Sequence, residues 1–178
     1  LSKYSKGSFG SIHGPTISTL SKEPNWSINR LRSFLFEGYL GDIIGSPLKK
    51  GIAKGEILIS NLTIFCSLIG TNDMPNCEGK IIIFEDVNED IYKIDRMFTH
   101  IRMSQVLKNI VGIGFGNFFD PKLTDKIELL ENLIFDRFAE FNIPMISNLP
   151  IGHLTGNACL PYGYRGIFNG NNGKLSIN

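Results

Sequence analysis

Cysteine is scarce in this chain, and its spacing matches neither a disulfide framework nor a zinc ribbon. The three residues, Cys66, Cys77 and Cys159, are an odd number and contain no C-x-x-C pair. Reduced thiols in a reducing compartment fit this pattern, so we expect a cytoplasmic protein. The three histidines also lack ligand spacing, so the sequence predicts no metal site, and no cofactor is expected.

Long hydrophobic runs and an excess of one charge are also absent. No apolar stretch approaches the roughly 20 residues that a helix needs to cross a bilayer. The formal net charge is +1, from 18 basic and 17 acidic side chains, and the basic residues are scattered. We therefore expect neither a nucleic-acid partner nor a membrane partner. What remains is a chain of 178 residues with an ordinary globular composition, long enough for one well-packed domain.

Hydrophobic patterning predicts alternating strands and helices in the middle of the chain. The run Lys80–Phe84, between Gly79 and two acidic residues, is typical of a strand buried on both faces. Four further elements are predicted in turn: a helix at 91–106, a strand at 110–115, a helix opened by Asp120 and Pro121, and a strand at 143–147. This order favours an α/β layer with parallel strands and right-handed crossovers.

The two ends of the chain contain more turns. Apolar residues at helical spacing predict a helix at 27–37 that ends at Gly38. Glycines and prolines at 41–56 predict turns and short strands. The apolar stretch 62–69 does not alternate, so strand and buried helix both stay open. A glycine- and asparagine-rich turn at 170–173 predicts a hairpin, and the extra strands would extend the sheet or form a second small one.

Two polar residues are predicted to lie beyond the carboxyl ends of strands, where open α/β sheets hold their sites. Glu85 directly follows the Ile-Ile-Ile-Phe strand, and His153 lies in a loop after the strand at 143–147. A carboxylate beside an imidazole fixes the tautomer and stabilises the imidazolium that forms in general-base catalysis. The alternative is a capping or ion-paired Glu and a loop His in ordinary hydrogen bonds. The pattern alone leaves both interpretations open.

Other motifs are weaker evidence of function, and no nucleophile completes the pair of Glu85 and His153. No serine lies in a G-x-S-x-G context. The segment Gly112–Gly116 resembles a nucleotide-binding loop, but Asn117 replaces its last glycine, so close packing of a strand is the favoured role. Glu85 and Asp86 are adjacent and would point to opposite faces of a strand, which argues against a glycosidase pair.

Several short segments together suggest a family. In chain order they are His13-Gly14-Pro15, Asn61-Leu62, Gly79–Val87, Asp95-Arg96-Met97, Gly152-His153 with Asn157, and Leu160–Gly163. This order resembles the LD-carboxypeptidases, serine peptidases that include the microcin C self-immunity proteins, and the resemblance covers essentially the whole chain. One departure is Ile59-Ser60, which stands where the family has Gly-Gly before Asn-Leu.

The resemblance implies a swivelling β/β/α domain at residues 25–178, with a central, mainly parallel sheet and flanking helices. Residues 1–24 would be an irregular segment that connects it to a missing amino-terminal domain with the nucleophilic serine. Glu85 and His153 match the other two members of a Ser-His-Glu triad, so this chain alone would be inactive. The resemblance also suggests that three further residues shape the substrate loops: Asp86, Asn157 and His13.

The family acts on murein tetrapeptide in cytoplasmic peptidoglycan recycling, where it releases the terminal D-alanine without a metal. By resemblance we expect a murein peptide substrate and a homodimer. Two alternatives stay open. One is a catalytically inactive remnant that binds muropeptides, and the other is a microcin-type immunity peptidase that acts on a peptidyl nucleotide.

Overall fold

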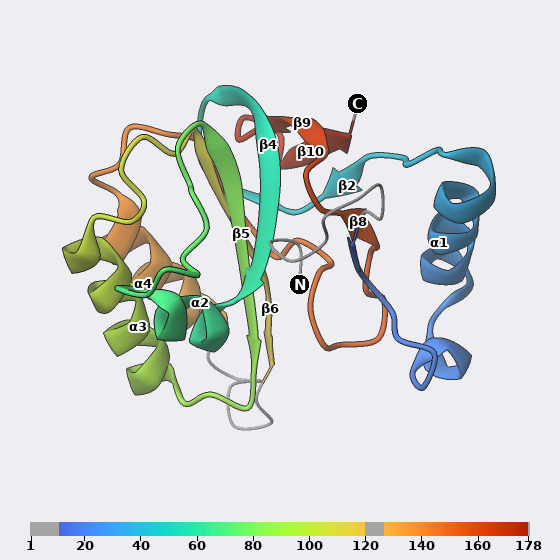
Figure 1. The fold of residues 1–178 in the computed structure, drawn as a ribbon, viewed down its shortest axis with the longest axis horizontal. Helices are drawn as coiled ribbons and strands as arrows, with labels where there is room; N and C mark the ends of the chain where they lie inside the picture. Colours follow the sequence, from blue (N-terminus) through green and yellow to red (C-terminus); the bar gives the residue numbers. More distant parts are fainter. Residues whose placement is uncertain (1–10, 120–126, 178) are drawn as a thin grey trace.

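The structure, a computed structural model, describes residues 11–119 and 127–177, and within these ranges eight strands form one mixed central sheet (Figure 1). In spatial order the strands are β2 (Ile43–Ile44), β10 (Lys174–Ile177), β9 (Arg165–Asn169), β4 (Ile52–Asn61), β5 (Lys80–Val87), β6 (Gly112–Phe119), β7 (Met145–Ser147) and β3 (Ser46–Lys49). Strands β4 to β7 run parallel, and the edge strands are antiparallel. The predicted α/β fold with a central, mainly parallel sheet is confirmed.

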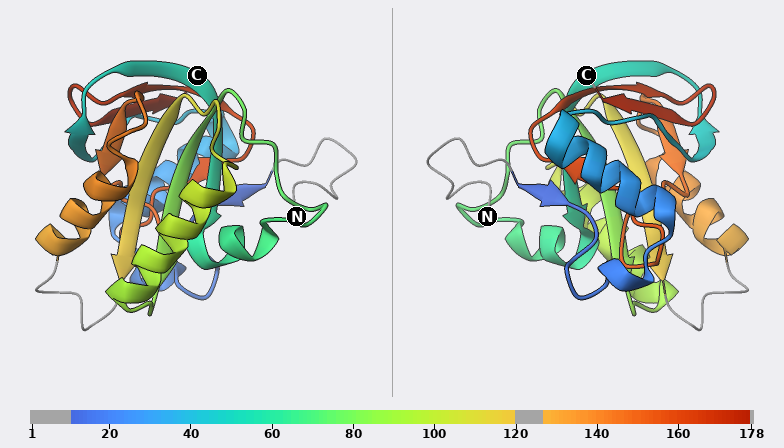
Figure 2. Two further views of the ribbon diagram at one scale, coloured as in Figure 1. Left: turned by 90° about the vertical axis from the view of Figure 1, so that its left-hand side faces the viewer. Right: turned by 90° about the vertical axis from the view of Figure 1, so that its right-hand side faces the viewer.

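Three helices connect the parallel strands and pack on the same face of the sheet, as the left view of Figure 2 shows. They are α2 (Leu62–Leu68), α3 (Ile91–Ser104) and α4 (Ile127–Phe138). The fourth helix, α1 (Asn25–Glu37), lies on the other side, after a 3-10 turn at Leu20–Lys22. A separate two-stranded sheet pairs β1 (Ile12–His13) with β8 (Leu160–Pro161). None of the helices in the described ranges is long and apolar enough to cross a membrane.

Phenylalanine side chains fill the core between the sheet and α2 to α4. Phe98 of α3 packs edge to face against Phe115 of β6 and Phe138 of α4, with ring centroids 5.7 Å and 5.1 Å apart. All three rings are fully buried. Edge-to-face packing of this kind adds to the free energy gained from burial. The helices therefore hold β5 and β6 firmly, and with them the carboxyl ends of both strands.

The opposite face of the sheet is covered by a loop instead of a helix layer. Leu149 and Ile151 of this loop pack with Ile83 of β5 and Phe168 of β9 in a second buried cluster. Glycine in β6 makes the close approach possible, because a Cβ at Gly114 would lie 2.9 Å from Leu149 Cδ1. The favoured role of this glycine-rich strand, close packing, is confirmed. The loop that begins here carries His153.

The segment whose pattern was ambiguous is a helix with a side-chain cap at its start. Residues 62–68 form helix α2, and Asn61 Oδ1 accepts a hydrogen bond from Ile64 N–H at 3.1 Å at its start. Helix α1 ends as predicted, since Gly38 adopts a left-handed conformation with φ of 67°. The hairpin of β9 and β10 is also confirmed.

Two predictions need correction. Strand β5 continues to Val87, with an irregular register against β6 between Phe84 and Asp86, so Glu85 lies within the strand and does not follow it. The predicted extra strands at the two ends are present, since most join the main sheet and β8 pairs with β1 in a second small sheet. Residues 11–24, predicted to be irregular, include β1 and the 3-10 turn. The predicted helix start at Asp120 and Pro121 lies outside the described residues.

Candidate active site

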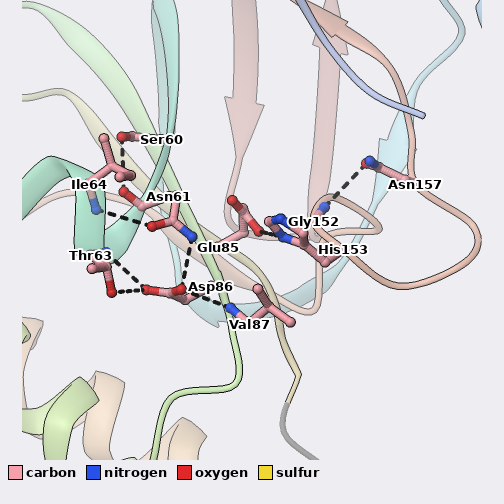
Figure 3. Close-up of polar contacts among 10 residues, drawn as sticks. All are labelled: Ser60, Asn61, Thr63, Ile64, Glu85, Asp86, Val87, Gly152, His153 and Asn157. Atoms are coloured by element: carbon pink, nitrogen blue, oxygen red, sulfur yellow. Dashed lines mark hydrogen bonds and ion pairs between the residues drawn. The ribbon is translucent and has the colours of Figure 1, made fainter. Parts of the chain in front are cut away.

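Glu85 and His153 meet at the edge of the parallel sheet, although 68 residues separate them in the chain (Figure 3). Glu85 Oε2 lies 2.7 Å from His153 Nδ1. The carboxylate is buried, with 1% of the residue exposed, whereas the side chain of His153 is 51% exposed. When Nδ1–H donates a hydrogen bond to the carboxylate, the basic lone pair of the neutral imidazole is on Nε2, which can then act as a base.

Two glycines let the His153 loop reach Glu85 across β6. A Cβ at Gly116 would lie 2.3 Å from the carbonyl oxygen of Ile151, where Asn117 N–H donates a hydrogen bond at 2.7 Å. Gly152 has a φ of 138°, and a Cβ there would lie 3.3 Å from Glu85 Oε2. Side chains at these two positions would push the loop away from the strand, so the glycines set the separation of the pair.

Burial dominates the electrostatics of the carboxylate. The pKa of Glu85 is raised above its ordinary value of 4.5 because burial penalises the charged form. The hydrogen bond and the charge of His153 act in the opposite direction and lower this pKa, while the nearby charge of Asp86 raises it. The imidazole therefore contributes most to stabilising the ionised Glu85 in this buried position, and a hydrogen bond from Asn61 adds to it.

The pair lines a cavity of about 780 Å³ that can hold a small peptide. Its wall combines the segment 11–23, the junction of β4 and α2, and the loop 152–157. Tyr162 completes one side, where its hydroxyl donates a hydrogen bond to the carbonyl oxygen of Ile59. An exposed imidazole held by a buried carboxylate in a cavity of this size is an arrangement suited to proton transfer.

His13 faces the same cavity from β1, where it pairs with Leu160 of β8. Its pKa is lowered to about 4, first because the ring is largely buried and then because of the charge of His153. The ring is therefore neutral at neutral pH. Its Nε2 is buried and has no hydrogen-bond partner in the part of the chain that the structure describes.

Asn157 and Asp86 hold backbone in place. Asn157 is 7% exposed and lines the cavity, and its Oδ1 accepts a hydrogen bond from Gly152 N–H at 3.2 Å. Asp86 points away from Glu85, as predicted, and accepts four hydrogen bonds of 2.8–2.9 Å from the groups that Figure 3 shows: Asn61 Nδ2, Thr63 N–H, Thr63 Oγ1 and Val87 N–H. Asp86 is not among the residues that line the cavity.

The structure therefore brings four of the five predicted residues to one cavity and leaves Asp86 behind its wall. A substrate contact for any of the five stays a prediction. No sequence pattern indicated Glu23, which also lines the cavity and accepts hydrogen bonds from backbone N–H groups of the His153 loop. Contacts to backbone leave no residue pattern, so no motif could have indicated it. No group of three His, Cys, Asp or Glu side chains in the two described ranges is arranged to hold a metal ion.

Comparison with known proteins gives consistent matches. Residues 54–167, a range that includes Glu85 and His153, match the model of the LD-carboxypeptidase C-terminal domain. A protein of Synechocystis sp. that is named as a carboxypeptidase is 37% identical over 169 residues, which are 94% of this chain and 56% of that protein. The murein tetrapeptide carboxypeptidase of Pseudomonas aeruginosa is 26% identical over an alignment of 183 positions that covers 96% of this chain and 60% of that protein.

A solved structure has the same fold. The muramoyltetrapeptide carboxypeptidase from Oxalobacter formigenes matches with a TM-score of 0.80 at 24% identity, over 94% of this chain and 60% of that one. The chain thus spans between 56% and 60% of the length of these three proteins.

Proposed function

This chain belongs to the LD-carboxypeptidase family, and we propose that it supplies the base and the orienting carboxylate of a serine peptidase that releases D-alanine from murein tetrapeptide. The observation that supports this most is the 2.7 Å contact between Glu85 Oε2 and His153 Nδ1 at the wall of a large cavity. In a Ser-His-Glu triad the carboxylate binds Nδ1 and leaves Nε2 free for the nucleophile.

The proposed nucleophile is a serine of an amino-terminal domain outside this chain. Within residues 11–119 and 127–177, the only hydrogen-bond partner of His153 is Glu85, so no serine there is placed as a triad member would be. In the proposed architecture, residues 1–24 connect that domain to the domain at 25–178. The chain alone is then inactive. We also propose that the full-length protein is a homodimer and that it acts in the cytoplasm, in peptidoglycan recycling. The three free cysteines are compatible with a reducing compartment.

The proposed reaction is acyl transfer in two steps. His153 takes the proton of the serine hydroxyl, and the serine oxygen attacks the carbonyl carbon of the L-to-D peptide bond. His153 then gives this proton to the amine of D-alanine, which leaves as the C–N bond breaks. Water, deprotonated by His153, cleaves the acyl-enzyme and restores the serine. Glu85 stabilises the imidazolium in both steps, and no metal takes part.

Incubation of the full-length protein with murein tetrapeptide tests the proposal. We expect loss of one alanine from the peptide by mass spectrometry, D-alanine in the supernatant, and no effect of a chelator. A matched tetrapeptide that ends in L-alanine is expected to stay intact. Binding of the murein peptide without cleavage would contradict the proposal in favour of an inactive remnant. Cleavage of a peptidyl nucleotide alone would contradict it in favour of a microcin-type peptidase.

A further inference from the structure

The loop that carries His153 contains no helix or strand between β7 and β8, so its shape depends on contacts with other segments. Figure 1 shows the loop running out from the sheet toward α1 before it returns to β8. The sheet holds one end of it, through the hydrogen bond of Asn117 N–H to the carbonyl oxygen of Ile151. The returning half of the loop, residues 156–159, contacts residues just before and within α1.

Glu23 is the central contact on that side. The residue is 8% exposed, and its Oε2 accepts hydrogen bonds from Gly156 N–H at 2.8 Å and Asn157 N–H at 3.1 Å. No lysine or arginine forms an ion pair with it among the ion pairs of the described residues. Within the part of the chain that the structure describes, these two backbone donors are the partners of the carboxylate, and charge-assisted hydrogen bonds of this kind are strong.

Helix α1 reinforces this contact. Ser27 Oγ donates a hydrogen bond to the carbonyl oxygen of Asn157 at 2.7 Å, and Arg30 Nε donates one to the carbonyl oxygen of Cys159 at 3.1 Å. Gly156 has a φ of 87°, and a Cβ there would lie 3.1 Å from the indole of Trp26. The returning half of the loop is thus held tightly against the start of α1.

A short series of hydrogen bonds connects Glu23 to the imidazole. Glu23 fixes the backbone of Asn157, and Asn157 Oδ1 accepts the hydrogen bond from Gly152 N–H at 3.2 Å. Gly152 directly precedes His153, whose ring lies 2.7 Å from Glu85. The backbone conformation at 152 sets the direction of the His153 side chain, so each of these contacts affects where the imidazole lies.

We infer that Glu23 is a positioning residue, which holds the 152–157 loop so that the His153 imidazole stays on Glu85. The inference rests on the proposed function for its catalytic meaning, since a fixed imidazole matters because His153 is the base. Without Glu23, two buried N–H groups would lose their acceptor, and the loop would have to open toward solvent to satisfy them.

The Nδ1–H proton of His153 gives a readout that a merely stabilising residue would not change. Full-length protein labelled with ¹⁵N on histidine is expected to show a far-downfield proton resonance for this hydrogen bond, assigned by its loss in His153→Ala. We expect Glu23→Ala to broaden this resonance beyond detection and Glu23→Gln, which keeps an acceptor oxygen, to retain it. Asn157→Ala removes the side-chain hydrogen bond to Gly152 N–H, and this variant is also expected to lose the resonance. It keeps the test decisive if Glu23→Ala does not fold.

Glu131→Ala is the matched control. Glu131 Oε1 also accepts two hydrogen bonds, from Ser147 Oγ and Asn148 Nδ2, both at 2.8 Å, but it acts at the start of the loop. We expect this variant to keep the His153 resonance. An intact resonance in Glu23→Ala or Asn157→Ala, or an equal loss in Glu131→Ala, would overturn the inference.

Kinetics provide the second readout. With murein tetrapeptide, Glu23→Ala is expected to lower kcat about tenfold because the change misplaces the base, and to raise KM by a smaller factor because the displaced loop is also part of the cavity wall. Glu131→Ala is expected to keep both values. If the wild-type protein released no D-alanine, the proposed function would fail, whereas the resonance experiment would still decide whether Glu23 positions His153.

Discussion

Replacing His153 with alanine is expected to lower kcat/KM of the full-length protein for murein tetrapeptide by at least about 10⁴-fold, because a serine hydroxyl is a weak nucleophile without a base. The fold should survive, since the imidazole is half exposed and Glu85 is its only hydrogen-bond partner in the described part of the chain. Steady-state release of D-alanine measures the loss, and thermal unfolding shows that the variant is folded.

The matched control is His100→Ala. His100 is an exposed residue of α3 and lines a different hollow, together with Arg96 and Met97. Its substitution is expected to leave kcat/KM within about twofold of the wild type, as surface changes away from a site usually do. Equal losses in both variants, or a residual activity of His153→Ala above about a tenth of the wild type, would show that His153 is not the base.

Glu85→Gln is expected to lower kcat about 10³- to 10⁴-fold, because a neutral amide cannot stabilise the imidazolium and favours the wrong tautomer of His153. Activity of the wild type should also fall as the pH is lowered, as protonation of the Glu85 and His153 pair removes the base. Rate measurements on both proteins between about pH 5 and pH 9 test this expectation.

Although Glu85→Gln is expected to lower activity, it is not expected to lower the stability of the fold at neutral pH. Because the pKa of Glu85 is raised in the folded protein, this group favours folding fully below its ordinary pKa of 4.5, and the contribution is lost as the pH rises through the raised value. At neutral pH the uncharged glutamine should therefore be at least as stable as the buried glutamate. Denaturant midpoints at pH 7 and pH 4 measure this, and a clear destabilisation at pH 7 would argue that Glu85 serves the fold.

The parts of the fold that depend on local patterns were predicted well. The β-branched run before Glu85 formed β5, and Gly38 ended α1 in the left-handed conformation that favours glycine. The 62–69 stretch was undecided because tertiary contacts determine it. Asp86, 23 residues away, accepts a hydrogen bond from Thr63 N–H and so stabilises the first turn of α2.

Sequence patterns alone could not establish the pairing of Glu85 with His153 in the candidate site. His153 follows β7, and its loop reaches Glu85 by crossing β6 at Gly116, beyond the residues of β6 that pair with β7. Glu23 went unnoticed for a similar reason, since its partners are backbone N–H groups that every residue type except proline possesses. The family resemblance suggested Asp86 as a residue that shapes the substrate loops, and its hydrogen bonds hold α2 and the end of β5.

The central claim is that His153, oriented by Glu85, activates a serine that lies outside this chain of 178 residues. Labelling of the full-length protein with a fluorophosphonate, followed by peptide mass spectrometry, tests it most directly. We predict a single adduct on a serine outside the 178 residues, and a labelling rate that falls at least about 10³-fold in His153→Ala. An adduct on a serine within the chain, or equal labelling rates in the wild type and His153→Ala, would contradict the claim.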